Sequence, residues 1–183
     1  GSHKGWGSPT NDFWCCHGSL VQANATHNRG IYFEDNSGIA VCQYIPSRTS
    51  WYKDGTTVDI SQKVNTQAGS CGAINQLNRD VKHRPMALSV DFQINCEIPV
   101  EFDLRIRIPW WIKGASIFIN GDKQTIDAQP STFFNISRVW NKDTVTVVLE
   151  KGLTVSRLPD DPDVVAFMEG PVVLAGLYDD ELE

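Results

Sequence analysis

Hydrophobic and polar residues alternate along most of the chain after residue 30. In "MALSVDFQI", apolar Leu88, Val90 and Phe92 are separated by single polar residues, and "EFDLRIRIP" repeats the pattern through Ile106 and Ile108. A period of two places the apolar side chains on one face of a strand. These stretches predict strands of antiparallel sheets that pack one face over a core.

Short turn signals separate the alternating stretches. "GIYFEDNSGIAVCQYI" predicts a hairpin around Asn36–Gly38, and Asp54-Gly55 and Asn120-Gly121 are tight-turn pairs. "TFFNISRVWNKDTVTVVLEKG" predicts two more strands on either side of residues 141–143. Roughly eight or more short strands with regular turns predict an all-β fold, an antiparallel, jelly-roll-like β-sandwich.

Two segments depart from the strand pattern. "SLVQANATHN" predicts a short helix, with Ser19 able to cap its start and Gly30 to end it. Residues 65–85 are polar and unusually long for a loop in a compact domain. We interpret them as an excursion or lid, with a binding loop as the alternative.

Composition and charge narrow the class of protein. The 183 residues suffice for one core, or for one domain and a piece of another, and the 41% hydrophobic and 21% charged content is typical of a globular chain. The net charge of −6, without clusters of Lys or Arg, argues against a nucleic-acid partner. No apolar run approaches the roughly 20 residues that span a membrane, so we expect no membrane partner. The sequence does not define a compartment.

The adjacent Cys15 and Cys16 are the residues with the clearest chemical potential. The chain has five cysteines, and an odd number cannot all pair in disulfides. A bond between adjacent cysteines would close a strained ring. Three interpretations remain from the residues alone: two buried small hydrophobic side chains, half of a zinc site, or a catalytic thiolate activated by a metal or by nearby positive charge.

Three stretches in the same order resemble glycoside hydrolase family 127 and its relatives: "FWCCHGS", "LRIRIPWWIKGASIFINGD" and "MEGPVVLAG". The most specific element is Phe13-Trp14-Cys15-Cys16 followed by Gly18. Members of this family are retaining β-L-arabinofuranosidases in which a helical (α/α)6 barrel precedes β-sandwich domains. The resemblance therefore implies that a short helical remnant of the barrel precedes the sandwich.

The resemblance also assigns roles. It implies that Cys15 is the nucleophile, held as a zinc-bound thiolate, and that Cys16 is a zinc ligand. In the family a further Cys and a Glu complete the zinc coordination, and a separate Glu is the acid/base. All three residues lie upstream of the Cys pair. His17 and Gln22 are candidate substrate contacts, although a polar residue at a helix start also explains His17. After the Cys pair many members continue with Gly and then Glu-Asn, whereas this chain has Leu20, Gln22 and Ala23.

These observations predict four segments. Residues 1–3, "GSH", are a tag remnant; residues 4–29 are the end of the barrel; residues 30–160 are the sandwich; and residues 161–183 are a strand leading into a further, truncated domain. We expect the parent enzyme to bind its carbohydrate substrate and zinc in the barrel. We expect the chain itself to be inactive, to hold no stable zinc and to self-associate through its ends.

A second function stays open from the sequence. The chain would instead be a non-catalytic β-sandwich that packs on an enzyme or binds carbohydrate through exposed aromatic side chains. Trp110 and Trp111 are adjacent, so we expect one to face the core and the other to be available for a sugar or a neighbouring domain.

Overall fold

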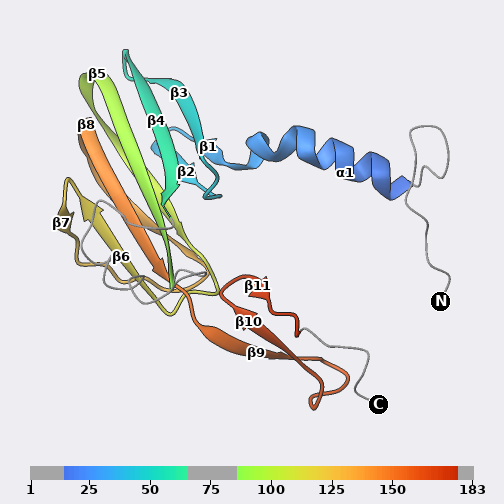
Figure 1. Cartoon of the computed structure of the whole chain (residues 1–183). Helices are drawn as coiled ribbons and strands as arrows, with labels where there is room; N and C mark the ends of the chain where they lie inside the picture. Colours follow the sequence, from blue (N-terminus) through green and yellow to red (C-terminus); the bar gives the residue numbers. More distant parts are fainter. Residues whose placement is uncertain (1–14, 66–85, 177–183) are drawn as a thin grey trace.

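The computed structural model describes residues 15–65 and 86–176, apart from the side chains of residues 15, 17 and 65. The predicted loop at residues 65–85 thus lies outside the described residues, except for its first position. Within these described ranges, a helix α1 (Cys15–Thr26) and a 3-10 turn η1 (His27–Gly30) precede eleven strands (Figure 1). The strands are β1 (Tyr32–Glu34), β2 (Gly38–Val41), β3 (Ser47–Lys53), β4 (Thr56–Asn65), β5 (Ala87–Ile108), β6 (Gly114–Ile119), β7 (Asp122–Lys123), β8 (Thr132–Glu150), β9 (Leu153–Arg157), β10 (Val165–Glu169) and β11 (Val172–Val173).

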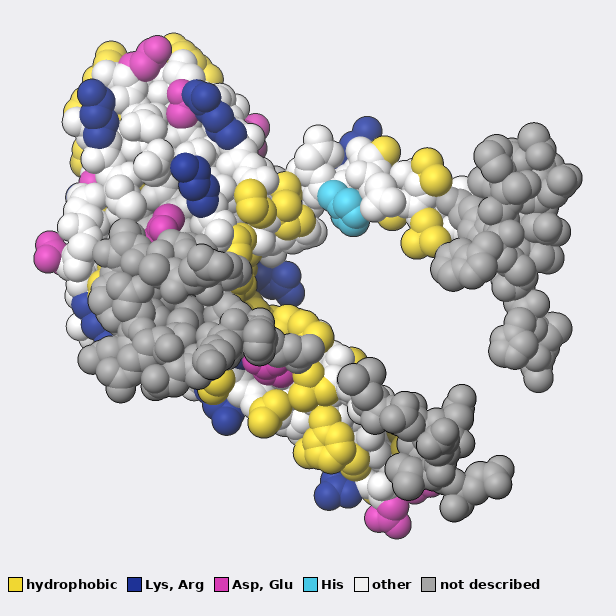
Figure 2. Space-filling model, in the orientation of Figure 1, with side chains coloured by type: hydrophobic (Ala, Val, Ile, Leu, Met, Phe, Trp, Pro, Cys, Tyr) yellow, Lys and Arg dark blue, Asp and Glu magenta, His cyan; other side chains and the backbone are white. Residues whose placement is uncertain are grey.

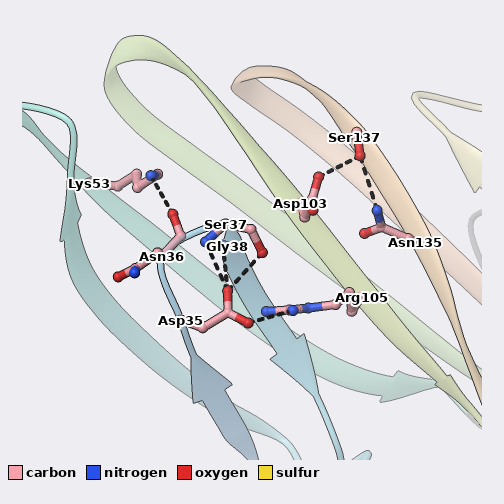
Figure 3. Close-up of polar contacts among 9 residues, drawn as sticks. All are labelled: Asp35, Asn36, Ser37, Gly38, Lys53, Asp103, Arg105, Asn135 and Ser137. Carbon is pink, nitrogen blue, oxygen red and sulfur yellow. Dashed lines mark hydrogen bonds and ion pairs between the residues drawn. The ribbon is translucent and has the colours of Figure 1, made fainter.

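Two long strands, β5 and β8, organise the sandwich. They pair antiparallel along their whole length, with a register shift between Asn95 and Val100. At that shift both ribbons bend over, so that each strand contributes to two layers (Figure 3). The first layer has the order β3-β4-β5-β8-β6-β7, and the second has the order β1-β2-β5-β8.

The bend has its own polar and aromatic contacts. The indole Nε1 of buried Trp140 donates to the Phe102 carbonyl at 2.9 Å, and the two rings stack with centroids 5.6 Å apart. The Asp143 carboxylate accepts the Asn141 amide at 2.8 Å. On β5, the Ile98 amide donates to Thr56 Oγ1 at 3.1 Å. Side chains therefore satisfy backbone groups near the irregularity in the ladder.

The core lies between the two layers and follows the predicted alternation. Phe92, Leu104, Ile106 and Ile108 are fully buried, as the period of two predicts. Leu88, which the same pattern placed in the core, is only half-buried at the end of β5. The prediction of an all-β sandwich preceded by a short helix is confirmed.

The tight turns also confirm the sequence prediction. Asp54 and Gly55 both have positive φ, as do Asn120 and Gly121, and this pair of conformations is that of a type I′ hairpin turn. The Asn120 side chain donates to Asp143 at 2.7 Å and accepts the Thr144 amide at 2.8 Å. The β6–β7 turn is thereby fixed to the bend of β8.

Three details differ from the sequence prediction. Residues 132–150 form one bent strand rather than two strands, because the ladder with β5 continues on both sides of the bend. β2 pairs parallel to β5, and a Cβ on Gly38 would overlap the Asp103 backbone at this pairing. The helix already includes Cys15, ahead of the predicted start at Ser19, and it ends at Thr26, whose hydroxyl donates to the Gln22 carbonyl at 3.1 Å.

The two ends of the described chain expose apolar side chains. Helix α1 extends away from the sandwich, and its Leu20 and Val21 are 62% and 67% exposed (Figure 1). Strands β9, β10 and β11 form a separate antiparallel sheet, here called the open sheet. Its Leu153, Val155 and Phe167 are more than half exposed, and hydrophobic side chains gather along this arm in Figure 2.

Replacement of Ile106 by Ala tests the core. Ile106 is fully buried between the layers, so the loss of its side chain leaves a cavity. We expect Ile106→Ala to lower the free energy of unfolding by about 2–5 kcal/mol in urea titrations. Val139→Ala, at a position 55% exposed on β8, is the control and should change it by less than about 0.5 kcal/mol. Equal effects of the two variants would contradict the assigned faces.

Candidate functional site

The Cys pair lies on α1, at its first two described residues. Cys16 is a free, exposed cysteine, and the side chains of Cys15 and His17 lie outside the described residues. Gln22 is exposed about two turns further along the helix. The structure thus places the four predicted site residues on one helix that projects from the sandwich.

The other described cysteines have thiols whose pKa is raised. Cys96 is buried in β5, where burial and then the nearby Asp143 carboxylate raise the pKa of its thiol to about 11. Burial likewise raises the pKa of Cys42, against the opposing charges of Arg107 and Arg105. Because the thiolate is the reactive form, neither residue is a candidate nucleophile. Cys71 lies outside the described residues.

Metal binding can be tested against the described side chains. Among residues 15–65 and 86–176, no group of three or more His, Cys, Asp or Glu side chains is arranged to hold a metal ion. A catalytic zinc ion takes at least three ligands from protein. The described side chains therefore include no such set, and those of Cys15 and His17 are not among them. In the same residues, no helix has the length and apolar content to cross a bilayer.

The structure also reveals a groove that the sequence did not single out. The groove has a volume of about 590 Å³. It is lined by residues 34–36 at the β1–β2 turn and by residues 51–54 at the end of the β3–β4 hairpin. We call it the turn groove. Lys53 Nζ joins its two sides, because it donates to the Asn36 carbonyl at 2.9 Å (Figure 3). It also contacts the carboxylate of the adjacent Asp54 at 3.1 Å.

Asp35 fixes the β1–β2 side of the turn groove. One carboxylate oxygen accepts the amides of Ser37 and Gly38 at 2.9 and 3.1 Å. The other contacts Arg105 Nη1 at 2.6 Å (Figure 3). The Arg105 guanidinium, followed by the Ser37 hydroxyl, holds the pKa of Asp35 well below its usual range.

The "EDNSG" and "YKDG" sequences gave a signal for two turns, and both turns were predicted. Their adjacency was not predictable from spacing. Asp35 and Lys53 belong to hairpins in different layers, and only the closed sandwich brings them together.

Comparisons with known proteins agree with the architecture. Residues 38–151 match the family described as "Beta-L-arabinofuranosidase, GH127 middle domain". A crystal structure of a GH127 beta-L-arabinofuranosidase from Geobacillus stearothermophilus T6 is similar over 88% of this chain and 24% of its own, with 25% identity and a TM-score of 0.69. No curated protein matches the chain in sequence.

Two further solved structures have the same fold. One, titled a glycoside hydrolase, is 19% identical with a TM-score of 0.68, over 87% of this chain and 25% of its own. The other, titled a GH127 beta-arabinofuranosidase, is 18% identical with a TM-score of 0.67, over 90% and 26%. The chain thus spans about a quarter of the length of the solved structures it matches.

Asp35→Asn tests the electrostatic anchor of the β1–β2 turn. The amide oxygen can still accept the two turn amides, so the variant removes mainly the charge opposite Arg105. Because the pKa of Asp35 is lowered on folding, its contribution to stability is present above the unfolded pKa of about 3.9 and is lost as the pH falls through the folded pKa.

We therefore expect Asp35→Asn to lower the urea midpoint at pH 7, and the difference from wild type to shrink as the pH falls below about 4. Added salt should also shrink it, because the pair is solvent-accessible. Asp160→Asn, at an exposed position, is the matched control. A difference that is independent of pH would show that the charge of Asp35 does not stabilise the turn.

Proposed function

The chain belongs to the GH127 β-L-arabinofuranosidase family through its middle domain, and from this membership we propose that it is part of a retaining hydrolase of β-L-arabinofuranosides or related plant-derived glycosides. The supporting observation is the position of Cys15 and Cys16 on a helix that precedes the middle domain. That helix exposes Leu20 and Val21, which is the expected surface of a helix that packs against other protein.

Cys15 is the proposed nucleophile. In a retaining glycosidase a nucleophile attacks the anomeric carbon while an acid donates a proton to the leaving oxygen. With Cys15, a carbon–sulfur bond would form as the glycosidic carbon–oxygen bond breaks. Water, deprotonated by the same acid/base group, would then displace the thiolate and release the sugar with retained configuration. We propose that the acid/base is a Glu of the catalytic barrel.

Cys16 is the proposed partner of Cys15 in metal binding. Two thiolates are too few for a zinc site, so we propose that a further Cys and a Glu of the barrel complete it. A bound zinc ion would lower the pKa of a coordinated thiol and so keep it ionised at neutral pH. We propose that His17 and Gln22 contact the substrate, and that the isolated chain self-associates through the apolar residues exposed at its ends.

Substitution of Cys15 in the full-length enzyme tests the nucleophile. We expect Cys15→Ser to abolish turnover of an aryl β-L-arabinofuranoside, because a serine hydroxyl is not ionised at neutral pH. The thermal midpoint should stay within a few degrees of wild type. Cys42→Ser is the matched control, since Cys42 lies in the sandwich and should tolerate the change with full activity. An active Cys15→Ser enzyme would remove the assignment.

Metal analysis of the 183-residue chain tests the proposal that the chain supplies two zinc ligands and the barrel supplies the others. We expect less than stoichiometric zinc after dialysis and no hydrolysis of arabinofuranosides, because two thiolates bind zinc weakly and no acid/base is supplied. The full-length enzyme should retain one zinc ion, and Cys16→Ser should lower that content. One tightly held zinc per isolated chain, or glycosidase activity that Cys15→Ser abolishes, would contradict this division.

A further inference from the structure

The turn groove has the build of a preformed binding site. Lys53 joins its two sides, and the Asp35–Arg105 pair holds one wall against β5. Its volume of about 590 Å³ lies within the range of small-ligand sites. A ligand entering such a groove does not need to order the turns first, which lowers the entropic cost of binding.

The side chains of the groove combine one aromatic ring with hydrogen-bonding groups of both kinds. The Tyr52 ring is 72% exposed, while the adjacent Trp51 is half-buried with its ring against Phe102 at 5.0 Å. Glu34 and Asp54 offer carboxylate oxygens, and the Asn36 amide both donates and accepts. A polyhydroxylated ring matches this set, since its hydroxyls donate and accept and its C–H face packs on an aromatic ring.

Charge restricts the class of ligand further. The carboxylates of Glu34 and Asp54 outnumber the one ammonium of Lys53, since Asp35 is paired with Arg105. An anionic ligand is therefore repelled, in a chain whose net charge is already −6. Lys53, whose side chain is 18% exposed, is itself paired with Asp54, so most of the charge in the groove is compensated internally and a cationic ligand gains little. A neutral ligand fits best.

A second hollow borders the same acidic turn. Glu34 and Asp35 also border a second hollow of about 250 Å³, whose apolar walls include Phe33 and Phe133. These two rings are 56% and 49% exposed. Only a ligand long enough to reach from one hollow to the other would meet the aromatic rings on both sides of the acidic turn, so a chain of several sugar units fits better than one.

We propose that the turn groove is a second, non-catalytic carbohydrate site that binds a neutral oligosaccharide, with Tyr52 as the stacking residue. This inference rests on the proposed function for its choice of sugar, a neutral arabinose-containing chain. The groove is lined by residues of β1, of β3 and of the turns that follow these two strands, and not by α1, so its occupation is separate from the chemistry at Cys15.

Binding is measured on the 183-residue chain by calorimetry and by NMR shift changes, with neutral arabino-oligosaccharides of two to six units. We expect dissociation constants on the order of 1 mM that become smaller with length. Tyr52→Ala should weaken binding about tenfold or more. Trp110→Ala removes an aromatic ring that is 55% exposed outside the groove, and it should leave binding unchanged. Circular dichroism and the thermal midpoint confirm that both variants fold.

The result that overturns the proposal is equally specific. A neutral-sugar site would be excluded if no NMR shifts changed at a sugar concentration 20-fold above the expected dissociation constant. It would also be excluded if Trp110→Ala rather than Tyr52→Ala lost binding, or if an oligolysine peptide or an oligogalacturonate bound more tightly. In the full-length enzyme, Tyr52→Ala should raise KM for a polymeric arabinan several-fold and leave an aryl arabinofuranoside unaffected. Failure of Cys15 as nucleophile would leave the binding results intact, so the two proposals fail independently.

Discussion

The continuous pairing of β5 with β8 is the constraint on which the other strands depend. Both strands bend together, and each half then serves as the template for one layer: β4 attaches to the first half of β5, and β2 attaches to the second. The bend itself is held by Trp140 and Asp143, which satisfy backbone groups with side-chain atoms. Since the core lies between the halves, a change that straightened the bend would separate the layers rather than loosen one strand.

The turn groove is a consequence of that closure. The β1–β2 turn belongs to one layer and the β3–β4 hairpin to the other, yet Lys53 reaches the Asn36 carbonyl across the rim. The Trp51 ring also packs against the Phe102 ring and so links this edge of the groove to the core. The two sides of the groove are therefore held by the sandwich, whereas the apolar Leu20 and Val21 of α1 are exposed.

The sequence predicted local structure better than it predicted adjacency. Alternation placed Phe92 and Ile106 in the core, and the Asn120-Gly121 pair gave the turn, because both depend on neighbouring residues. The parallel pairing of β2 with β5 and the single bent strand β8 depend on contacts far apart in the chain, and periodicity carries no such information. The Cys pair drew attention through its rarity, whereas the groove residues are common turn residues that become distinctive only when folded together.

The contacts of Asn120 bear on chemical ageing. An asparagine followed by glycine is the pair in which the side chain cyclises most readily onto the next amide and then hydrolyses to an acid. Here the Asn120 amide nitrogen and oxygen are both engaged, by Asp143 and by the Thr144 amide, so cyclisation must first break two hydrogen bonds. If the reaction occurs, a new carboxylate arises against Asp143, which is 9% exposed, and the two negative charges repel each other. Cyclisation and hydrolysis at the β6–β7 turn would thus place two negative charges beside the bend that joins the two layers.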